Sequence, residues 1–292
     1  MRIAIYSRGI EHNQQQDIEM LLKELLKHGA EPVFYQEFFN KIYSAVDIVG
    51  NYSTFNSSSD MDSSIDCLIS LGGDGTLLDT VTLVKDTGIP VLGVNYGRLG
   101  FLANIGKDEI NSAIEALVER KYVLDKRTLL HLDADVPIFG EIPYALNEFS
   151  LHKSDTSPMI KIHTYLNGEF LNTYWADGII VSTPTGSTGY SLSCNGPVVF
   201  PDSASFVITP VSPHNLNIRP IIVPDNTIVS FEVEGRTDNF ICSMDSRREL
   251  VSKDIQLAVK KESFGINLIR LNENNFLQTL RNKLSWGLDK RN

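Results

Sequence analysis

The residues most suited to chemistry in this chain form a glycine turn with one carboxylate at its centre. Residues 68–78 run from an apolar stretch, through Gly72-Gly73-Asp74-Gly75-Thr76, into a second apolar stretch. Three glycines within four positions let the backbone adopt positive φ and bring its N–H groups close to an anion. The apolar stretch after Thr76 predicts a helix whose N-terminus favours negative charge. The pattern predicts a phosphate site formed by the three glycines and Thr76.

The carboxylate of Asp74 requires a chemical explanation, because it would weaken the binding of a free phosphate. Its position indicates a base for an attacking hydroxyl, a ligand of Mg²⁺, or both. Two other phosphate motifs do not fit: a Walker A loop needs Lys where Thr76 stands, and a dinucleotide fingerprint from Gly73 needs Gly or Ala at Leu78. The alternative is a plain strand-to-helix turn, which usually needs fewer glycines and no central acid. We therefore take Asp74 as the candidate catalytic residue.

A second polar segment, residues 183–191, follows a predicted strand. Its hydroxyls, glycines and single aromatic ring suit hydrogen bonding to a polar heterocycle, with Tyr190 against the face of that heterocycle. The run Gly186-Ser187-Thr188-Gly189 lacks the G-x-S-x-G spacing of a hydrolase and does not indicate a nucleophilic serine. Composition alone leaves open an ordinary loop with an exposed tyrosine.

The elements that position these segments differ between the two halves of the chain. Up to about residue 122, strands at 3–6, 32–35 and 89–94 alternate with helices around 18–26 and at 107–121, which predicts a parallel sheet. Residues 51–64 predict a flexible surface loop, because a serine and aspartate run is too polar to pack.

Beyond residue 122 the helical period gives way to short alternating segments, typical of antiparallel strands. Asn167-Gly168 predicts a type I′ hairpin turn. The predicted strands are 160–166, 170–175, 178–182, 206–209, 227–234, 240–244, 255–259 and 267–271, and residues 276–284 return to helical spacing. We expect an α/β N-terminal domain, residues 1–125, joined by the C-terminal segment 276–292, and a β-rich, β-sandwich-like domain, residues 126–275.

Composition limits the class of partner. The chain has 292 residues and a formal net charge of −10, which argues against nucleic acid. An anionic substrate must then be held by backbone N–H groups, a few basic side chains and a cation, which favours Mg²⁺. Cys67, Cys194 and Cys242 stand far apart without C-x-x-C, so a reducing cytoplasm is expected. No apolar run has the length of a membrane span.

Taken together, the motifs resemble the NAD kinase family of the bacterial type. Diacylglycerol, sphingosine and phosphofructokinase families share the glycine-aspartate turn, but here five blocks match in order. The blocks are Gly72 to Thr76, Gly97-Arg98-Leu99-Gly100-Phe101, Asn147-Glu148, Asp177-Gly178 with residues 183–190, and residues 209–216 ending in Arg219-Pro220.

The resemblance implies transfer of the γ-phosphoryl of ATP to the 2′-hydroxyl of the adenosine ribose of NAD, with Mg²⁺ and without a dedicated protein metal site beyond Asp74. It implies Asp74 as the catalytic residue and a two-domain homo-oligomer, a tetramer or dimer. The implied NAD-binding residues are Asp74, Gly75, Phe101, Asn147, Glu148, Asp177, Thr188, Gly189, Tyr190, Ser191, Leu192 and Ser193. Two alternatives are a lipid or sugar kinase with the same turn, and a nucleotide-binding sensor without turnover.

Secondary candidates are Trp175, His214, Asp245 and Arg247. Many bacterial family members carry Arg where Trp175 stands, which bears on a cationic contact to the dinucleotide and on the choice of NAD over NADH. For His214 the sequence leaves open a phosphate contact or a structural role. Asn195 and Ser246 stand where the family often has glycine.

Overall fold

The chain forms two compact units in the computed structural model, which describes residues 1–9, 14–43, 52–97, 100–154, 158–271 and 276–285. Arg127–Gly265 makes up the second unit, and the first comprises Met1–Lys126 together with the residues from Ile266 onward. The chain passes between units within two strands, β7 (Val123–Ala134) and β18 (Leu257–Arg270). The first unit is therefore built from both ends of the sequence.

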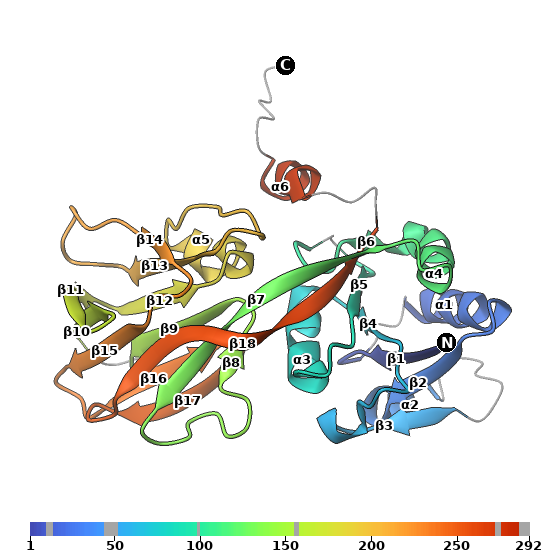
Figure 1. The fold of residues 1–292 in the computed structure, drawn as a ribbon, viewed down its shortest axis with the longest axis horizontal. Helices are drawn as coiled ribbons and strands as arrows, with labels where there is room; N and C mark the ends of the chain where they lie inside the picture. The colour runs from blue at the N-terminus through green and yellow to red at the C-terminus, as the bar shows by residue number, and fades with distance from the viewer. Residues whose placement is uncertain (10–13, 44–51, 98–99, 155–157, 272–275, 286–292) are drawn as a thin grey trace, which may run out of the picture. The chain divides into compact units, whose positions relative to one another are not determined.

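The first unit is a parallel sheet with helices (Figure 1). Its strand order is β18-β5-β4-β1-β2-β3, and each pairing in this order is parallel. The strands are β1 (Arg2–Tyr6), β2 (Glu31–Tyr35), β3 (Ser53–Phe55), β4 (Cys67–Leu71) and β5 (Val91–Asn95), with β6 (Ile105–Gly106) beside β5. The helices are α1 (Gln15–Lys27), α2 (Gln36–Ile42), α3 (Asp74–Val84), α4 (Ile110–Val118) and α6 (Phe276–Leu284). No helix among the described residues is long and apolar enough to cross a membrane.

Both faces of this sheet are covered, as expected for parallel strands. Leu21 of α1 and Ile114 of α4 share one core with Ile5 of β1, in agreement with the predicted helical spacing. The helix α3 packs on the other face, where Gly93 of β5 leaves room for it. A methyl group added at Gly93 would lie 2.8 Å from Leu77 Cδ1.

One prediction for this unit was wrong and one helix is shorter than predicted. Ser53–Phe55, within the predicted surface loop, forms β3 beside β2, and Phe55 is 2% exposed. Thr54 and Phe55 favour a strand, but the polar run after them concealed this signal. Residue 51 lies outside the described part. The helix predicted over 107–121 begins with a 3₁₀ turn, Lys107–Glu109, and is α-helical over Ile110–Val118.

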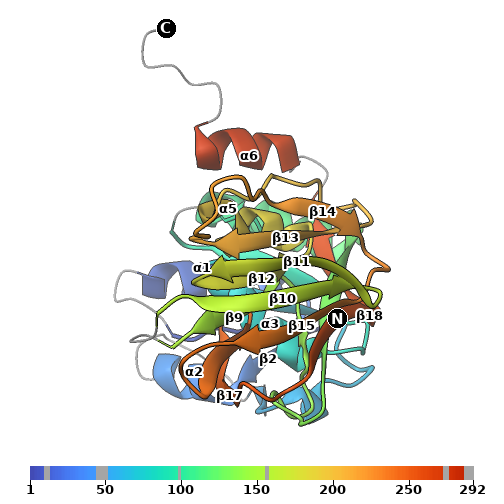
Figure 2. The same cartoon turned by 90° about the vertical axis from the view of Figure 1, so that its left-hand side faces the viewer.

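The second unit consists of antiparallel strands in two sheets (Figure 2). One sheet has the order β14-β13-β12-β9-β16-β17. The other contains β11, β10, β15 and β18, and in it β7 pairs with β18 and β8 pairs with β7. The strands are β8 (Tyr144–Ala145), β9 (Glu148–Lys153), β10 (Ile160–Leu166), β11 (Glu169–Ala176), β12 (Gly178–Ser182), β13 (Ser205–Val211), β14 (Ile221–Pro224), β15 (Val229–Glu234), β16 (Asn239–Met244) and β17 (Arg247–Ser252).

The two sheets share one apolar core, which makes this unit a β-sandwich. Phe149 of the first sheet stacks on Phe231 of the second, with ring centroids 5.5 Å apart, and Ile162 and Ile179 belong to the same cluster. The hairpin between β10 and β11 has positive φ at both turn residues, 52° at Asn167 and 82° at Gly168. The β-rich sandwich and the type I′ turn are thus confirmed.

The last strand of the sandwich differs from its prediction. Residues 255–259 and 267–271 were predicted as two strands, but Leu257–Arg270 is one continuous strand of 14 residues. The charged residues Lys260, Lys261 and Glu262 break the apolar alternation that marks a strand in sequence. The strand β18 pairs with β15 over Leu257–Val259 and also with β7, and it continues through the charged residues.

Candidate active site

The glycine turn connects β4 to α3 in the conformation that its sequence predicts. Gly72 has φ +150°, Gly73 is the N-cap, and α3 begins at Asp74. A methyl group added at Gly72 would lie 2.4 Å from Thr76 Oγ1, so both φ and space require glycine here. Gly73 and Gly75 are exposed, and N–H groups in the first turn of a helix have no carbonyl partner within the helix. This arrangement is suited to binding an anion.

Asp74 is fixed by the backbone of a neighbouring loop. Its Oδ2 accepts the N–H of Phe101 at 2.8 Å, and its Oδ1 accepts those of Leu102 at 3.0 Å and Ala103 at 2.9 Å. Gly100 lies so close that an added methyl group would be 1.8 Å from Oδ1. Two glycine blocks far apart in sequence therefore meet at one half-buried carboxylate of fixed orientation.

The remaining predicted residues of the first unit surround this carboxylate. Phe101 is partly exposed and uses its backbone N–H, not its ring, to hold Asp74. Thr76 is buried with its side chain against Gly72, so it supports the turn. Arg98 and Leu99 lie outside the described residues.

The hydroxyl-rich segment of the second unit follows β12 and forms a 3₁₀ turn, Thr185–Thr188, and a short helix, α5 (Tyr190–Ser193). Four of its hydroxyl groups are buried, and those of Thr183, Thr185 and Ser187 are bonded inside the unit. The bonds run from Thr183 Oγ1 to Leu146 O at 2.6 Å, from Ser187 Oγ to Pro184 O at 2.7 Å, and from Arg127 Nη1 to Thr185 Oγ1 at 3.1 Å. These groups hold the loop in shape.

The C-terminal part of this segment is the part that reaches solvent. Thr188 and Leu192 are half-buried, whereas Tyr190 and Ser193 are exposed. Ser191 is the exception, because it is fully buried and its hydroxyl pairs with that of Thr209 at 2.8 Å. Side-chain contacts to a ligand can therefore come from Thr188, Tyr190 and Ser193, but not from Ser191.

Tyr190 rests on a second ring. His152 of β9 stacks on Tyr190 with centroids 5.5 Å apart and an interplanar angle of 29°. Burial lowers the pKa of His152, so the ring beneath Tyr190 is neutral at pH 7. A methyl group at Gly178 would lie 2.6 Å from His152 Nδ1, so glycine is needed beside it. The sequence analysis missed His152, because the strand β9 was not predicted.

Asn147 and Glu148 are positioned by Asp245. The carboxylate of Asp245 accepts the N–H groups of Leu146 at 2.9 Å, Asn147 at 2.8 Å and Glu148 at 3.1 Å. In return the N–H of Asp245, which has φ 53°, donates to the carbonyl of Glu148 at 2.9 Å. Asp245 therefore shapes the start of β9, and its carboxylate is not directed at a ligand.

The side chains of this pair contain acceptors without partners. Asn147 Oδ1 and Glu148 Oε2 are buried and lack a hydrogen-bond partner in the described part of the chain. A methyl group at Gly189 would lie 2.9 Å from Glu148 Oε2. Burial and the nearby Asp245 raise the pKa of Glu148 to about 8, against the opposing effect of the Tyr190 N–H. Buried polar atoms are normally satisfied, so these two oxygens are candidates for hydrogen bonds to a ligand.

The other candidates of this unit have partners of their own. Asp177 forms an ion pair with Lys153 at 2.7 Å. Trp175 stacks on His214 with centroids 4.6 Å apart, and the His214 N–H donates to the Trp175 carbonyl at 2.8 Å. Trp175 is 49% exposed, so this stack offers an aromatic surface in place of a cation.

The side chain of Arg247 is bound to other parts of the second unit. Its guanidinium donates to the carbonyls of Ile142 and Tyr144 and lies 5.5 Å from the ring centroid of Phe139. Burial lowers its pKa. Its neighbour Arg248 is exposed and acts on the pKa values of His152 and Tyr190 through its charge. Arg248 is thus the better placed cation of the two.

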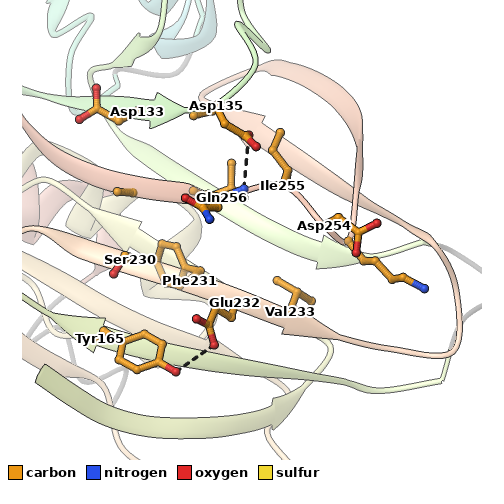
Figure 3. A pocket seen from close by; sticks show the side chains of 14 residues that line it. Asp133, Asp135, Tyr165, Ser230, Phe231, Glu232, Val233, Asp254, Ile255 and Gln256 are labelled. Atoms are coloured by element: carbon orange, nitrogen blue, oxygen red, sulfur yellow. Dashed lines mark hydrogen bonds between the residues drawn. The ribbon is translucent and has the colours of Figure 1, made fainter. Parts of the chain in front are cut away.

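A cavity of about 600 Å³ lies elsewhere in the second unit (Figure 3). Figure 3 shows Tyr165 and Glu232 on one of its sides and Asp135 with the backbone of Gln256 on another, joined by bonds of 2.9 Å and 3.3 Å. None of the predicted site residues lines it.

A glycine-aspartate turn at a helix start in a parallel α/β unit, combined with a β-sandwich unit, defines a two-domain kinase. Family models identify the family within this class. The ATP-NAD kinase N-terminal domain matches residues 9–122, and the ATP-NAD kinase C-terminal domain matches residues 146–271. The chain belongs to the NAD kinase family.

Individual proteins agree with this assignment. The chain is 47% identical to the NAD kinase of Cytophaga hutchinsonii and 46% identical to that of Flavobacterium psychrophilum, with 100% of both chains covered in each case. Among solved structures, yeast NADH kinase complexed with NADH has a TM-score of 0.88 at 22% identity, covering 99% of this chain and 88% of that one. An NAD kinase from Archaeoglobus fulgidus in complex with ATP has a TM-score of 0.75 at 22% identity, covering 98% and 100%. These two structures share the fold.

Proposed function

We propose that this protein transfers the γ-phosphoryl group of ATP to the 2′-hydroxyl of the adenosine ribose of NAD, giving NADP and ADP. The observation that carries the proposal is the Asp74 carboxylate, fixed by three backbone N–H groups at the first residue of α3. Membership of the NAD kinase family supports the choice of substrates.

The reaction needs one base and a site for phosphate. The 2′-oxygen of NAD attacks the γ-phosphorus, the bond from that phosphorus to the β–γ bridging oxygen breaks, and ADP leaves. The proton of the 2′-hydroxyl goes to Asp74, which acts as general base. The backbone of Gly72, Gly73 and Gly75 faces the phosphates. Because Asp74 is fixed before substrate binds, little reorganisation is needed at the moment of transfer.

The donor atoms present fit a magnesium ion that arrives on the ATP phosphates. Within the described part of the chain, no group of three or more His, Cys, Asp or Glu side chains forms a protein metal cage. Asp74 Oδ2 accepts one hydrogen bond, from Phe101, and a carboxylate oxygen can accept a further contact. Bound there, Mg²⁺ would neutralise the charge of the phosphates.

The NAD site is proposed in the β-rich domain, residues 126–275, and the phosphate site in residues 1–125 with 276–292. Asn147 and Glu148 would form hydrogen bonds with the adenosine, through the two buried oxygens that lack partners. Thr188, Tyr190 and Ser193 would surround adenine, with backbone contributions from Gly189, Ser191 and Leu192. Asp177 would contact the nicotinamide end, and Phe101 would line the pocket.

Three further proposals come from the resemblance and the composition. We expect a cytoplasmic homo-oligomer, a tetramer or dimer, in which a neighbouring subunit completes the adenine site. Trp175 stands where many bacterial family members have Arg, so its exposed ring replaces a cation. NADH should therefore be tested as an acceptor beside NAD. His214 would act through its stack with Trp175.

The test is a panel of donors and acceptors with the purified chain. We expect ADP and NADP to form together from ATP and NAD, and ATP to persist when NAD is omitted. Phosphorylation of diacylglycerol or a sugar phosphate instead of NAD would replace this proposal with the lipid or sugar kinase. Binding of both nucleotides without product would indicate a sensor. Polyphosphate and NADH in the same panel define the donor and acceptor range.

A further inference from the structure

Arg8 lies beside the glycine turn because of the strand order of the sheet. The strands β1 and β4 are parallel neighbours, with Tyr6 paired to Ser70. Arg8 follows the end of β1 by two residues, and the glycine turn follows the end of β4. The carboxyl ends of adjacent parallel strands meet at one edge of the sheet, where ligands of α/β folds bind.

The guanidinium of Arg8 is anchored to the first turns of α3. Its Nε donates to Asp79 Oδ2 at 2.5 Å, and its Nη2 donates to Asp79 Oδ1 at 2.7 Å and to the Gly75 carbonyl at 3.1 Å. Tyr6 Oη donates to Asp79 Oδ2 at 3.0 Å. This fork geometry is specific to arginine, and a lysine could not reproduce it.

One end of the guanidinium remains available. Nη1 carries two N–H donors and has no hydrogen-bond partner among the described residues. It lies over the turn, because a methyl group added at Gly75 would be 3.7 Å from it. The Arg8 side chain is 55% exposed, so a ligand at the turn can reach this group. Because the chain has a net charge of −10, its overall field does not attract a phosphate, and a local cation beside the turn takes that role.

We propose that Arg8 is a phosphate-binding residue of the proposed kinase site, where its Nη1 group donates to a phosphate oxygen of the triphosphate donor. The inference rests on the proposed function. Asp79 is the positioning residue, since it binds two nitrogens of the guanidinium and leaves the third nitrogen facing the turn. Tyr6 assists by donating to Asp79.

The experiment compares Arg8→Gln, Arg8→Lys and Asp79→Asn with the parent chain. The matched control is Arg2→Gln, at the other end of β1, where Arg2 pairs with Glu31 at 3.3 Å away from the glycine turn. For each protein the thermal unfolding midpoint, kcat, and the KM values for ATP and NAD are measured. Inorganic triphosphate serves as a competitive inhibitor against ATP, because it contains the phosphates without the nucleoside.

We expect Arg8→Gln to raise the KM for ATP roughly 10- to 100-fold, the range for lost hydrogen bonds to a charged group. The inhibition constant of triphosphate should rise with it, while the KM for NAD changes less than about twofold. Arg8→Lys should recover part of the loss. Asp79→Asn should have a smaller effect, and the double variant should match Arg8→Gln because Asp79 acts through Arg8. Arg2→Gln should leave both KM values unchanged.

Three results would overturn the inference. Unchanged constants for ATP and triphosphate in a folded Arg8→Gln variant would remove Arg8 from the site. A rise in the KM for NAD alone would assign Arg8 to the dinucleotide instead. A lower kcat with unchanged KM values, together with a lower unfolding midpoint of Arg8→Gln, would leave Arg8 with a structural role. Failure of the parent chain to make NADP would instead count against the proposed function itself.

Discussion

The glycine turn of the first unit and the hydroxyl-rich loop of the second unit use their polar atoms in opposite ways. In the turn, Gly73 and Gly75 are exposed and the backbone at the start of α3 faces outward. In the loop, Thr183, Thr185 and Ser187 are buried, and their hydroxyls bind inside the unit. The backbone of the first segment is therefore accessible to a ligand. Most hydroxyl groups of the second segment are used in hydrogen bonds that hold the loop.

The difference shows which kind of motif can be interpreted from sequence. Glycine has no side chain to serve the core, so a cluster of glycines indicates a backbone requirement with few alternatives. A hydroxyl can serve either the fold or a ligand. Ser187 and Ser193 are chemically identical, yet Ser187 is fully buried and Ser193 is exposed. Five variants test this contrast.

Replacement of Asp74 tests the turn most directly. Asp74→Asn removes the base and should lower turnover by roughly 10²–10⁴-fold, the usual contribution of a positioned acid–base group. The amide can also no longer accept all three N–H bonds from residues 101–103, which should reduce stability by about 1–3 kcal/mol. Turnover, NAD affinity and thermal unfolding are measured on one preparation. Turnover within a few-fold of the parent would show that Asp74 is not the base.

A methyl group on Gly72 tests the backbone of the turn. Gly72→Ala meets both a positive φ and a contact of 2.4 Å with Thr76 Oγ1, so we expect a loss of about 2–5 kcal/mol in the free energy of unfolding. Gly88→Ala is the matched control, since Gly88 has φ +77° and open space around it. Its loss should stay near 1 kcal/mol. Equal losses in urea unfolding would mean that space at Gly72 does not matter.

A pair of substitutions in the second unit should separate its two kinds of residue. Ser187→Ala removes a hydroxyl that bonds Pro184 and Val199 and should reduce stability by about 1–3 kcal/mol without changing the KM for NAD. Tyr190→Ala should raise the KM for NAD and leave the stability nearly unchanged. The loss of a ring stack of about 0.5–1.5 kcal/mol corresponds to a rise of roughly 2- to 12-fold in the KM for NAD. A rise in the KM for ATP instead would assign the pocket to the other nucleotide.

Glu148 gives a dependence of stability on pH. Its pKa of about 8 in the folded protein exceeds the unfolded value near 4.3, so the folded state binds the extra proton between these values. Stability from Glu148 is therefore present below about pH 4.3 and is lost as the pH rises through 8. Glu148→Gln should flatten this decline when urea unfolding is measured from pH 5 to 8.5. Parallel curves for the two proteins would contradict the assignment.

The sequence predicted the glycine turn, the Asn167-Gly168 hairpin and the bounds of α6, because each depends on local backbone preferences. It did not predict β17, in which Val251 is the buried residue and the rest of the strand has no apolar period. The sequence analysis also proposed Asp245 and Arg247 as site candidates, whereas the side chains of both bind backbone groups within residues 142–148. Such roles depend on contacts about 100 residues apart in sequence, which no local pattern encodes.

The long strand β18 has a consequence for the order in which the protein is made. The edge of β5 beside Val91 is completed by Leu268, and Ile269 belongs to the core of the first unit. A ribosome must therefore synthesise the whole second unit before the first unit can close its sheet. During that interval the part of β5 around Val91 is an open parallel edge, the kind of surface to which other chains add strands. Translation that stops between the two units leaves a fragment with that edge exposed, so this hazard of aggregation ends when β18 has been made and has paired with β5.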